Sequence, residues 1–339
     1  MSSSTTSRAG RVDYGEAHSA ACGHGRFGRA YDRGHYPLWD EAHPAHFVGH
    51  SAGAQVVRLL QQMLHDGAFP GHAATSERWV LSVTSLSGAL NGSTRAYIDG
   101  ARVEDGGRSL RPVCLLQICR VGSVLYHWLD LPPWLKRYYD FGFDHFGMSR
   151  RLVGARGLAD ALVAGRRGLF ATGDWIVPDL TIQGAARINA RVRTFPGTFY
   201  FSYASRVPSG LLGIHPLLFL RALQMRRWRW PAGAPPPYEG YRDEDWEDND
   251  GALNTFSMTH PRVPEEHSSE PVEEEEEDGA RCGPASGTTG SWRRTTWHSS
   301  SIAAAGACSS TSSTTASSAT AGVCACRTAP PPTQLRKQS

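Results

Sequence analysis

The chain of 339 residues, 40% of them hydrophobic, is long enough for one large α/β domain or two smaller domains. Its formal net charge of +3 is too small to indicate nucleic acid as a partner, and no run of about 18 uncharged apolar residues predicts a membrane span. Seven irregularly spaced cysteines and a start without an apolar core favour reduced thiols in an intracellular protein.

The first predicted elements form a strand–turn–helix unit. Residues 46–48 ("HFV") are typical of the end of a buried strand, and residues 54–64 ("AQVVRLLQQML") place their apolar side chains mainly on one helical side. Further along the chain we expect strands at 78–86 and 198–204, and helices near 151–165 and 180–193. Strands alternating with helical crossovers predict an α/β fold with a mostly parallel sheet flanked by helices.

The ends of the chain differ in composition from its middle. Residues 1–10 read as a leader that is not native to the fold, and a proline-rich surface loop begins near residue 228. Residues 261–282 read as an acidic linker, because a run of carboxylates usually forms a solvated segment. Residues 283–339 are rich in Ala, Ser, Thr and Cys without any sustained period, so we expect a disordered low-complexity tail.

The pentapeptide Gly49-His50-Ser51-Ala52-Gly53 lies between the first predicted strand and helix. In the nucleophile elbow of a serine hydrolase, a strand delivers the serine to a tight turn and a helix N-terminus faces the developing oxyanion. The context predicts Ser51 as a nucleophile, with the Ala52 N–H as an oxyanion donor. A chance occurrence of the pattern around an ordinary serine is the alternative.

An activated serine needs a histidine base and an acid that orients it, in the chain order serine, acid, histidine on this fold. The acidic loop after residue 241 offers four aspartates: Asp243, Asp245, Asp248 and Asp250. Spacing does not choose among them, but the turn formed by an Asp-Gly pair favours Asp250. The downstream histidines are His260, His267 and His298. None follows a strand-like run, so we expect all three to be loop residues.

Several long segments resemble, in the same order, the zinc-containing lipases of the thermoalkaliphilic bacterial type and, more closely, their plant lipase-like relatives. The segments, within residues 11–263, are "VDYGEAHSAACGHGRFGRAY", "HFVGHSAGAQVVRLLQQML", "WVLSVTSLSGALNGST", "FATGDWIVPDLTIQGAARIN" and "DEDWEDNDGALNTFSMTHPR". The resemblance implies an α/β-hydrolase fold over residues 11–260, with Ser51 as nucleophile and Asp250 as acid. It also implies a triacylglycerol or other long-chain acyl ester as substrate, met at a lipid–water interface.

The same resemblance implies a structural Zn²⁺ held by two histidines and two aspartates and not needed for catalysis. His18, His24 and Asp174 match three of these ligands. From the residues alone, two histidines six apart near Cys22 are only suggestive of a metal site, and surface histidines are the alternative. The apolar segment 113–150 falls where this family has its mobile lid, with ordinary core packing as the alternative.

The chain departs from this family before Ser51. An α/β-hydrolase places several strands and an oxyanion loop ahead of the nucleophile, whereas the first predicted strand here ends just before the pentapeptide. We therefore expect an N-terminal truncation that removes the second oxyanion donor, one zinc aspartate and the first core strands.

The second departure is the histidine base, which is absent as written; residues 283–301 read "GPASGTTGSWRRTTWHSSS". Threonine codons are ACN and the tryptophan codon is TGG. If the codon of Arg294 ends in G, a frame shifted back by one nucleotide turns "RTTWH" into Asp-His-(Met, Leu or Val)-Ala. We expect a frameshift near residue 283, with the histidine encoded across Thr295 and Thr296. The alternative is a catalytically inactive lipase-like fragment or lipid-binding remnant.

Overall fold

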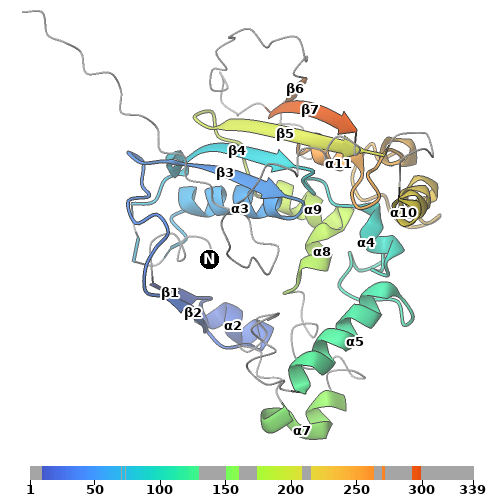
Figure 1. Ribbon diagram of the computed structural model, residues 1–339, viewed down its shortest axis with the longest axis horizontal. Helices are drawn as coiled ribbons and strands as arrows, with labels where there is room; N and C mark the ends of the chain where they lie inside the picture. The colour runs from blue at the N-terminus through green and yellow to red at the C-terminus, as the bar shows by residue number, and fades with distance from the viewer. Residues whose placement is uncertain are drawn as a thin grey trace, which may run out of the picture.

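The computed structural model describes residues 10–69, 71–72, 74–129, 150–159, 174–207, 215–262, 269–271 and 292–298. Figure 1 shows these as ribbons coloured along the chain. Residues 1–9 of the predicted leader, residues 130–149 of the predicted lid, His267 and residues 299–339 of the predicted tail lie outside the described residues.

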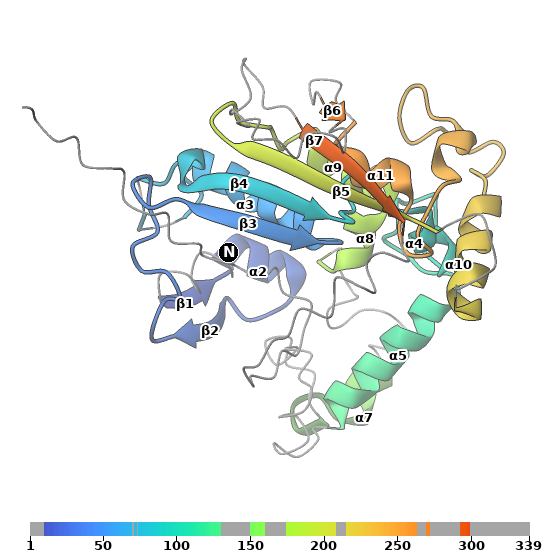
Figure 2. The same cartoon turned by 45° about the horizontal axis from the view of Figure 1, so that its top comes forward.

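A five-stranded sheet organises the described residues (Figures 1 and 2). Its strands in spatial order are β3 (Ala45–His50), β4 (Val80–Leu86), β5 (Phe199–Arg206), β7 (Trp292–His298) and β6 (Ser269–Pro271). Every neighbouring pair is parallel. The predictions of a parallel sheet and of strands near 46–48, 78–86 and 198–204 are confirmed.

The helix α3 (Gly53–His65) follows β3 and confirms the helix expected at 54–64. One side of α3 buries Val57, Leu60 and Leu64, which join a core cluster with Phe47 of β3 and Tyr200 of β5. Burial of each large aliphatic side chain contributes about 1.5–3 kcal/mol relative to exposure, so this apolar stripe is what holds α3 against the sheet.

Two further helices lie in the same layer as α3. The side chain of Asn189 at the end of α9 (Ile182–Asn189) meets that of Gln55 on α3 at 3.3 Å. The helix α11 (Thr255–Thr259) contacts β5 on the face that carries Tyr200, because Ser202 two residues on donates to the Thr259 carbonyl. On the opposite face, the β5 side chain of Tyr203 is exposed. Within the described residues, these three helices therefore cover one face of the sheet.

A small unit precedes the sheet. Strands β1 (Gly10–Asp13) and β2 (Phe27–Tyr31) pair antiparallel, and the short helix α2 (Glu16–Cys22) lies between them in the chain. Figures 1 and 2 show this unit beside the main sheet rather than within it. Sequence periodicity did not predict it, because four- and five-residue strands are too short to establish a pattern.

The remaining elements are short or lie at the periphery. They are η1 (Glu77–Trp79), α4 (Thr94–Ile98), α5 (Leu115–Trp128), α7 (Arg150–Ala159), α8 (Ile176–Leu180), α10 (Pro216–Arg227) and η5 (Asp243–Trp246). The helix expected near 151–165 corresponds to α7, in which Gly154 leaves helical geometry at φ 58°. The Trp128 indole donates to the Gly154 carbonyl and joins α5 to α7. Among the described helices, none is long and apolar enough to cross a membrane.

Two strands correct the sequence analysis of the C-terminal part. The expected acidic linker 261–282 contains β6, and the expected disordered tail 283–339 contains β7, paired with β5 over its whole length. The segment "WRRTTWH" is rich in tryptophan and threonine, which favour strands, although it has no apolar alternation. Pairing with the sheet therefore decides its conformation, and periodicity could not reveal it.

Candidate active site

Ser51 sits in a strained turn between β3 and α3. Its φ is 54°, a left-handed conformation that residues other than glycine rarely adopt. The Ser51 N–H donates to the Leu86 carbonyl at 3.1 Å, and the Ser51 carbonyl accepts from the N–H groups of Ala89 at 3.0 Å and Ala54 at 3.3 Å. Within the described part of the chain, no group bonds its hydroxyl. The turn is thus held on both sides while the hydroxyl stays available.

Steric crowding explains why the pentapeptide contains small residues. A Cβ at Gly49 would lie 2.6 Å from the backbone N and Cα of Ala54, so no larger residue fits where the end of β3 packs against the start of α3. Gly88, beyond β4, is equally confined, since its Cβ would lie 2.7 Å from the Ala54 methyl group. The Ala52 N–H lies at the start of α3, where the first amides of a helix have no intrahelical acceptor. Such amides, with the positive end of the helix dipole, suit a developing oxyanion.

Asp250 is a half-buried carboxylate fixed by three donors. Its Oδ1 accepts from the backbone N–H groups of Ala252 at 2.9 Å and Leu253 at 2.8 Å, and its Oδ2 accepts from the Ser205 hydroxyl at 2.6 Å. Gly251, at φ 87°, makes the tight turn that brings these amides back to the carboxylate. The Asp-Gly pair therefore forms the turn that the sequence predicted.

A series of hydrogen-bonded side chains joins Asp250 to the end of β4. Ser87 follows β4 at φ 44° and is the other non-glycine residue with positive φ among those described. Its hydroxyl lies 2.8 Å from that of Ser205, which in turn donates to Asp250. Sequence analysis missed both serines, because an isolated serine at a strand end gives no pattern signal.

The parallel register brings these groups to one edge of the sheet. His50 of β3 pairs with Leu86 of β4, which pairs with Tyr203 of β5. Ser51 and Ser87, which directly follow the first two strands, therefore lie at the same level, at the carboxyl ends where α/β sheets bind ligands. The backbone of Val207, just past β5, donates to the Asn249 carbonyl, which anchors the acidic loop at this edge.

The other aspartates of the acidic loop have partners of their own. Asp243 accepts from the Trp230 N–H and the Tyr241 hydroxyl, and Asp245 pairs with Arg242 at 2.7 Å. Burial, together with the nearby Asp243 carboxylate, raises the pKa of the Tyr241 hydroxyl, which therefore stays protonated as a donor. These two aspartates hold the loop together, which leaves Asp250 and the exposed Asp248 as candidates.

The histidines lie as follows. His260 ends α11, and its carbonyl accepts from the Asn91 side chain at 2.8 Å. His298 is the last residue of β7 and is paired with Arg206, so the expectation that it is a loop residue is wrong. Among the described side-chain contacts, Asp250 receives no bond from a histidine.

A second cluster lies at the β1–α2–β2 unit. One donor atom each from His18, Cys22, His24 and Asp174 can be chosen so that all four lie within 4.8 Å of one another. The Nε2 atoms of His18 and His24 are each 3.4 Å from the same oxygen of Asp174. This confirms that the three residues singled out from the sequence meet in space; the structure adds Cys22.

Local geometry orients the ring of His24. Gly23 ends α2 in a left-handed conformation, φ 68°, and the His24 N–H donates back to the Ser19 carbonyl at 3.1 Å. The His24 Nδ1 lies 2.8 Å from the Gly25 carbonyl, which can only accept, so Nδ1 carries the proton. A neutral imidazole so held presents the lone pair of Nε2 to the cluster, as metal-binding histidines do.

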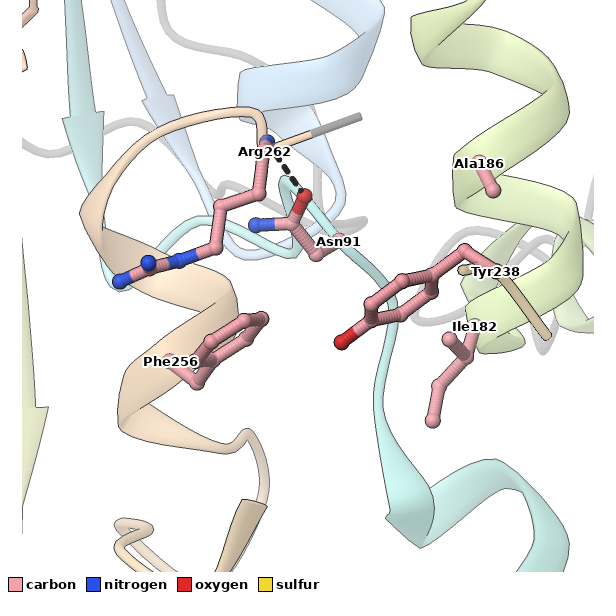
Figure 3. A pocket seen from close by; sticks show the side chains of 6 residues that line it. All are labelled: Asn91, Ile182, Ala186, Tyr238, Phe256 and Arg262. Atoms are coloured by element: carbon pink, nitrogen blue, oxygen red, sulfur yellow. Dashed lines mark hydrogen bonds between the residues drawn. The ribbon is translucent and has the colours of Figure 1, made fainter. Parts of the chain in front are cut away.

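One small cavity lies away from both groups (Figure 3). It measures about 10 Å³ and is lined by Asn91, Ile182, Ala186, Tyr238, Phe256 and Arg262. A space of that size holds at most about one water molecule. In Figure 3 the Arg262 backbone N–H donates to Asn91, a bond of 2.9 Å that closes one side. This cavity is too small for an acyl ester.

Comparison with known proteins finds similarity to lipases. The profile of the family described as "Lipase-like, C-terminal domain" matches residues 6–75. The lipase of Staphylococcus hyicus is 28% identical over 256 residues, which cover 75% of this chain and 38% of that protein. Lipase 2 of Staphylococcus aureus is 27% identical over 273 residues, 75% of this chain and 36% of that protein. The chain therefore spans less than two fifths of the length of these relatives.

Solved lipase structures are similar to the chain in overall fold. The crystal structure of S. hyicus lipase matches with a TM-score of 0.59 and 24% identity, covering 87% of this chain and 71% of that one. Lipase 1 from Pelosinus fermentans matches with a TM-score of 0.55 and 25% identity, covering 87% and 76%. The chain shares the fold of these lipases, and in this chain the pentapeptide begins at the end of β3, a strand of the sheet.

Proposed function

We propose that this chain, a relative of the bacterial lipases, is a serine carboxylic-ester hydrolase of the lipase type. The observation that carries the proposal is the conformation of Ser51, at φ 54° in a strand–turn–helix elbow with its hydroxyl available. A non-glycine residue is kept in such a conformation at a cost of about 1–3 kcal/mol, and such strain is concentrated at functional sites. The proposed substrate is a triacylglycerol or another long-chain acyl ester.

In the proposed reaction, the Ser51 Oγ attacks the ester carbonyl carbon while a histidine base takes its proton. The oxyanion of the tetrahedral intermediate accepts from the Ala52 N–H, and the alcohol leaves with the proton that the histidine returns. Water then attacks the acyl-enzyme by the same steps in reverse. Asp250 orients the base, a task supported by the three donors that fix its carboxylate.

The base itself is proposed to be encoded in the shifted frame across Thr295 and Thr296. The parallel register pairs these residues with Tyr203 and Ala204 of β5, directly before Ser205, which holds Asp250. A histidine introduced at this point of β7 would therefore enter the sheet next to the proposed acid. A chain with no base would be inactive, since its loss costs several orders of magnitude in rate.

We also propose that His18, His24 and Asp174 hold a structural Zn²⁺. The donor set fits: two imidazoles and a carboxylate are ordinary zinc ligands. In a tetrahedral site with ligands about 2.0–2.1 Å from the metal, ligand atoms lie about 3.3 Å apart. Both histidine–carboxylate separations are 3.4 Å. The ion would join α2 to Asp174, two residues before α8.

The lipid–water interface is proposed as the working environment. The helix α5 and the loop before it expose Val113, Leu115 and Ile118, with exposed fractions of 92%, 46% and 68%. These side chains belong to the segment proposed as a lid, and they would be buried on contact with a lipid surface.

A fluorophosphonate probe tests the proposed chemistry, because it labels activated serines only. We expect no labelling of the chain as written, and labelling of Ser51 once the shifted frame from residue 283 and any preceding strands are restored. Ser51→Ala must abolish the label, whereas Ser76→Ala, which removes an N-cap hydroxyl at η1 outside the proposed site, must keep it. Failure of the restored protein to label would refute the proposal. Labelling of the unrestored chain that is lost in His298→Ala would assign the base to His298 instead.

A further inference from the structure

We infer that the thiolate of Cys22 is a ligand of the metal held by His18, His24 and Asp174, completing a set of two nitrogens, one oxygen and one sulfur. The inference rests on the metal site proposed above and is independent of ester hydrolysis. Among the described residues, these four alone form a group with metal-ligating spacing.

The helix α2 places the thiol. Cys22 is four residues after His18, so both side chains project from the same side of one helix. The Cys22 Sγ is 3.8 Å from the Nδ1 of His18, whereas the Nε2 of the same ring faces Asp174. One ligand atom of Cys22 lies within 4.8 Å of ligand atoms of His18, His24 and Asp174. A tetrahedral Zn²⁺ with a sulfur at about 2.3 Å and a nitrogen at about 2.0 Å sets these two ligand atoms about 3.5 Å apart, so a modest shift of the thiol would bring it onto the ion. The thiol takes part in no disulfide.

The next residues close the cluster around the same point. Gly23 turns the chain at the end of α2, and His24, whose side chain is only 1% exposed, points back toward Asp174. The ring planes of His18 and His24 cross at 63° with centroids 5.2 Å apart, and the Nε2 atoms of both rings face the same Asp174 oxygen. The helix, the turn after it and Asp174, two residues before α8, thus offer donors from three segments, as a closed structural site needs.

Charge favours the thiolate as the fourth ligand. Two neutral imidazoles and the Asp174 carboxylate leave a bound Zn²⁺ with one net positive charge. A Cys22 thiolate makes the site neutral, which lowers the cost of holding the ion in a half-buried position. Binding deprotonates the thiol, and the proton passes to solvent.

Cobalt substitution tests the inference directly. Co²⁺ fits the same site and a thiolate ligand gives it an intense near-ultraviolet charge-transfer band, which nitrogen and oxygen ligands do not. We expect one Zn²⁺ per chain by metal analysis and the sulfur band in the Co²⁺ form. Cys22→Ala should lose the band and bind Zn²⁺ more than ~100-fold more weakly, beyond the loss usual for outer-shell changes. Cys119→Ala, which removes an exposed thiol on α5, is the matched control and should keep both.

Two outcomes distinguish the proposed metal site from the role of Cys22 as its fourth ligand. A protein that binds one Zn²⁺ but shows no sulfur band with Co²⁺ would overturn the role of Cys22 and leave the proposed metal site standing; a protein that binds no metal would overturn both. Cys22→Asp, which keeps an anionic donor, should retain Zn²⁺ and lose the band. If Cys22→Ala does not fold, alkylation of the unaltered protein decides: Cys22 should resist iodoacetamide with Zn²⁺ bound and react after chelation. Equal reactivity in both states would contradict the inference.

Discussion

Replacing Ser51 by glycine and by alanine measures the strain in the elbow. Both variants lack the hydroxyl, so their difference in stability isolates the backbone. Alanine keeps a Cβ at φ 54°, where left-handed geometry costs about 1–2 kcal/mol, and glycine removes that cost. The glycine variant also has a more flexible unfolded chain, which lowers its stability by about 0.4–1 kcal/mol relative to the alanine variant. Ser51→Gly should therefore be more stable than Ser51→Ala by about 0.8 kcal/mol.

Urea denaturation of the two variants, followed by tryptophan fluorescence, measures this difference, and thermal unfolding should show a gap of about 1–4 °C. The control is Ser85, the last but one residue of β4, whose φ is not positive and whose hydroxyl has no partner among the described residues. There the order must reverse, with glycine less stable than alanine by about 0.5–1 kcal/mol. If Ser51→Gly is no more stable than Ser51→Ala while the control behaves as expected, Ser51 is not strained and the nucleophile assignment loses its main support.

Three further outcomes are expected. Gly49→Ala should lower the free energy of unfolding by about 1–3 kcal/mol in urea titrations, because its Cβ meets helix backbone at 2.6 Å and the strand must shift; an unchanged midpoint would contradict the tight crossing. Ser205→Ala should cost about 1.5–3 kcal/mol, since Asp250 loses a charge-assisted donor, and a double-mutant cycle with Asp250→Ala should show coupling rather than additivity. Burial opposes ionisation of Glu77, but the hydrogen bond from His65, a backbone hydrogen bond and the nearby charges of His65 and Arg78 together outweigh it and keep the Glu77 pKa below its usual value. This stabilisation is present above a pH of about 4.3 and is lost as pH falls through the lower folded pKa. Stability curves of wild type and Glu77→Gln should converge there; curves that run parallel below pH ~4 would contradict the pair.

The local pattern of the sequence was sufficient for the central unit. The apolar stripe of 54–64 required a helix with one buried side, and the strand-like run before it required a partner sheet. Together with the glycines and serine of the pentapeptide between them, these patterns predicted the elbow around Ser51. The turn chemistry of the Asp-Gly pair likewise singled out Asp250, whose Oδ1 accepts from the two amides of that turn. Both results rest on contacts between residues close in the chain, which composition and spacing encode.

Contacts between distant residues were decided by the tertiary structure. Ser87 and Ser205 are 118 residues apart and meet only because parallel register aligns the ends of β4 and β5. Asp174, far along the chain, joins His18, Cys22 and His24 only because the fold brings it against their segment. The strand β7 exists through its pairing with β5, in a segment whose own pattern predicts no structure. Local sequence fixes which conformations a segment can adopt, whereas the sheet fixes which distant side chains become neighbours, and the site depends on both.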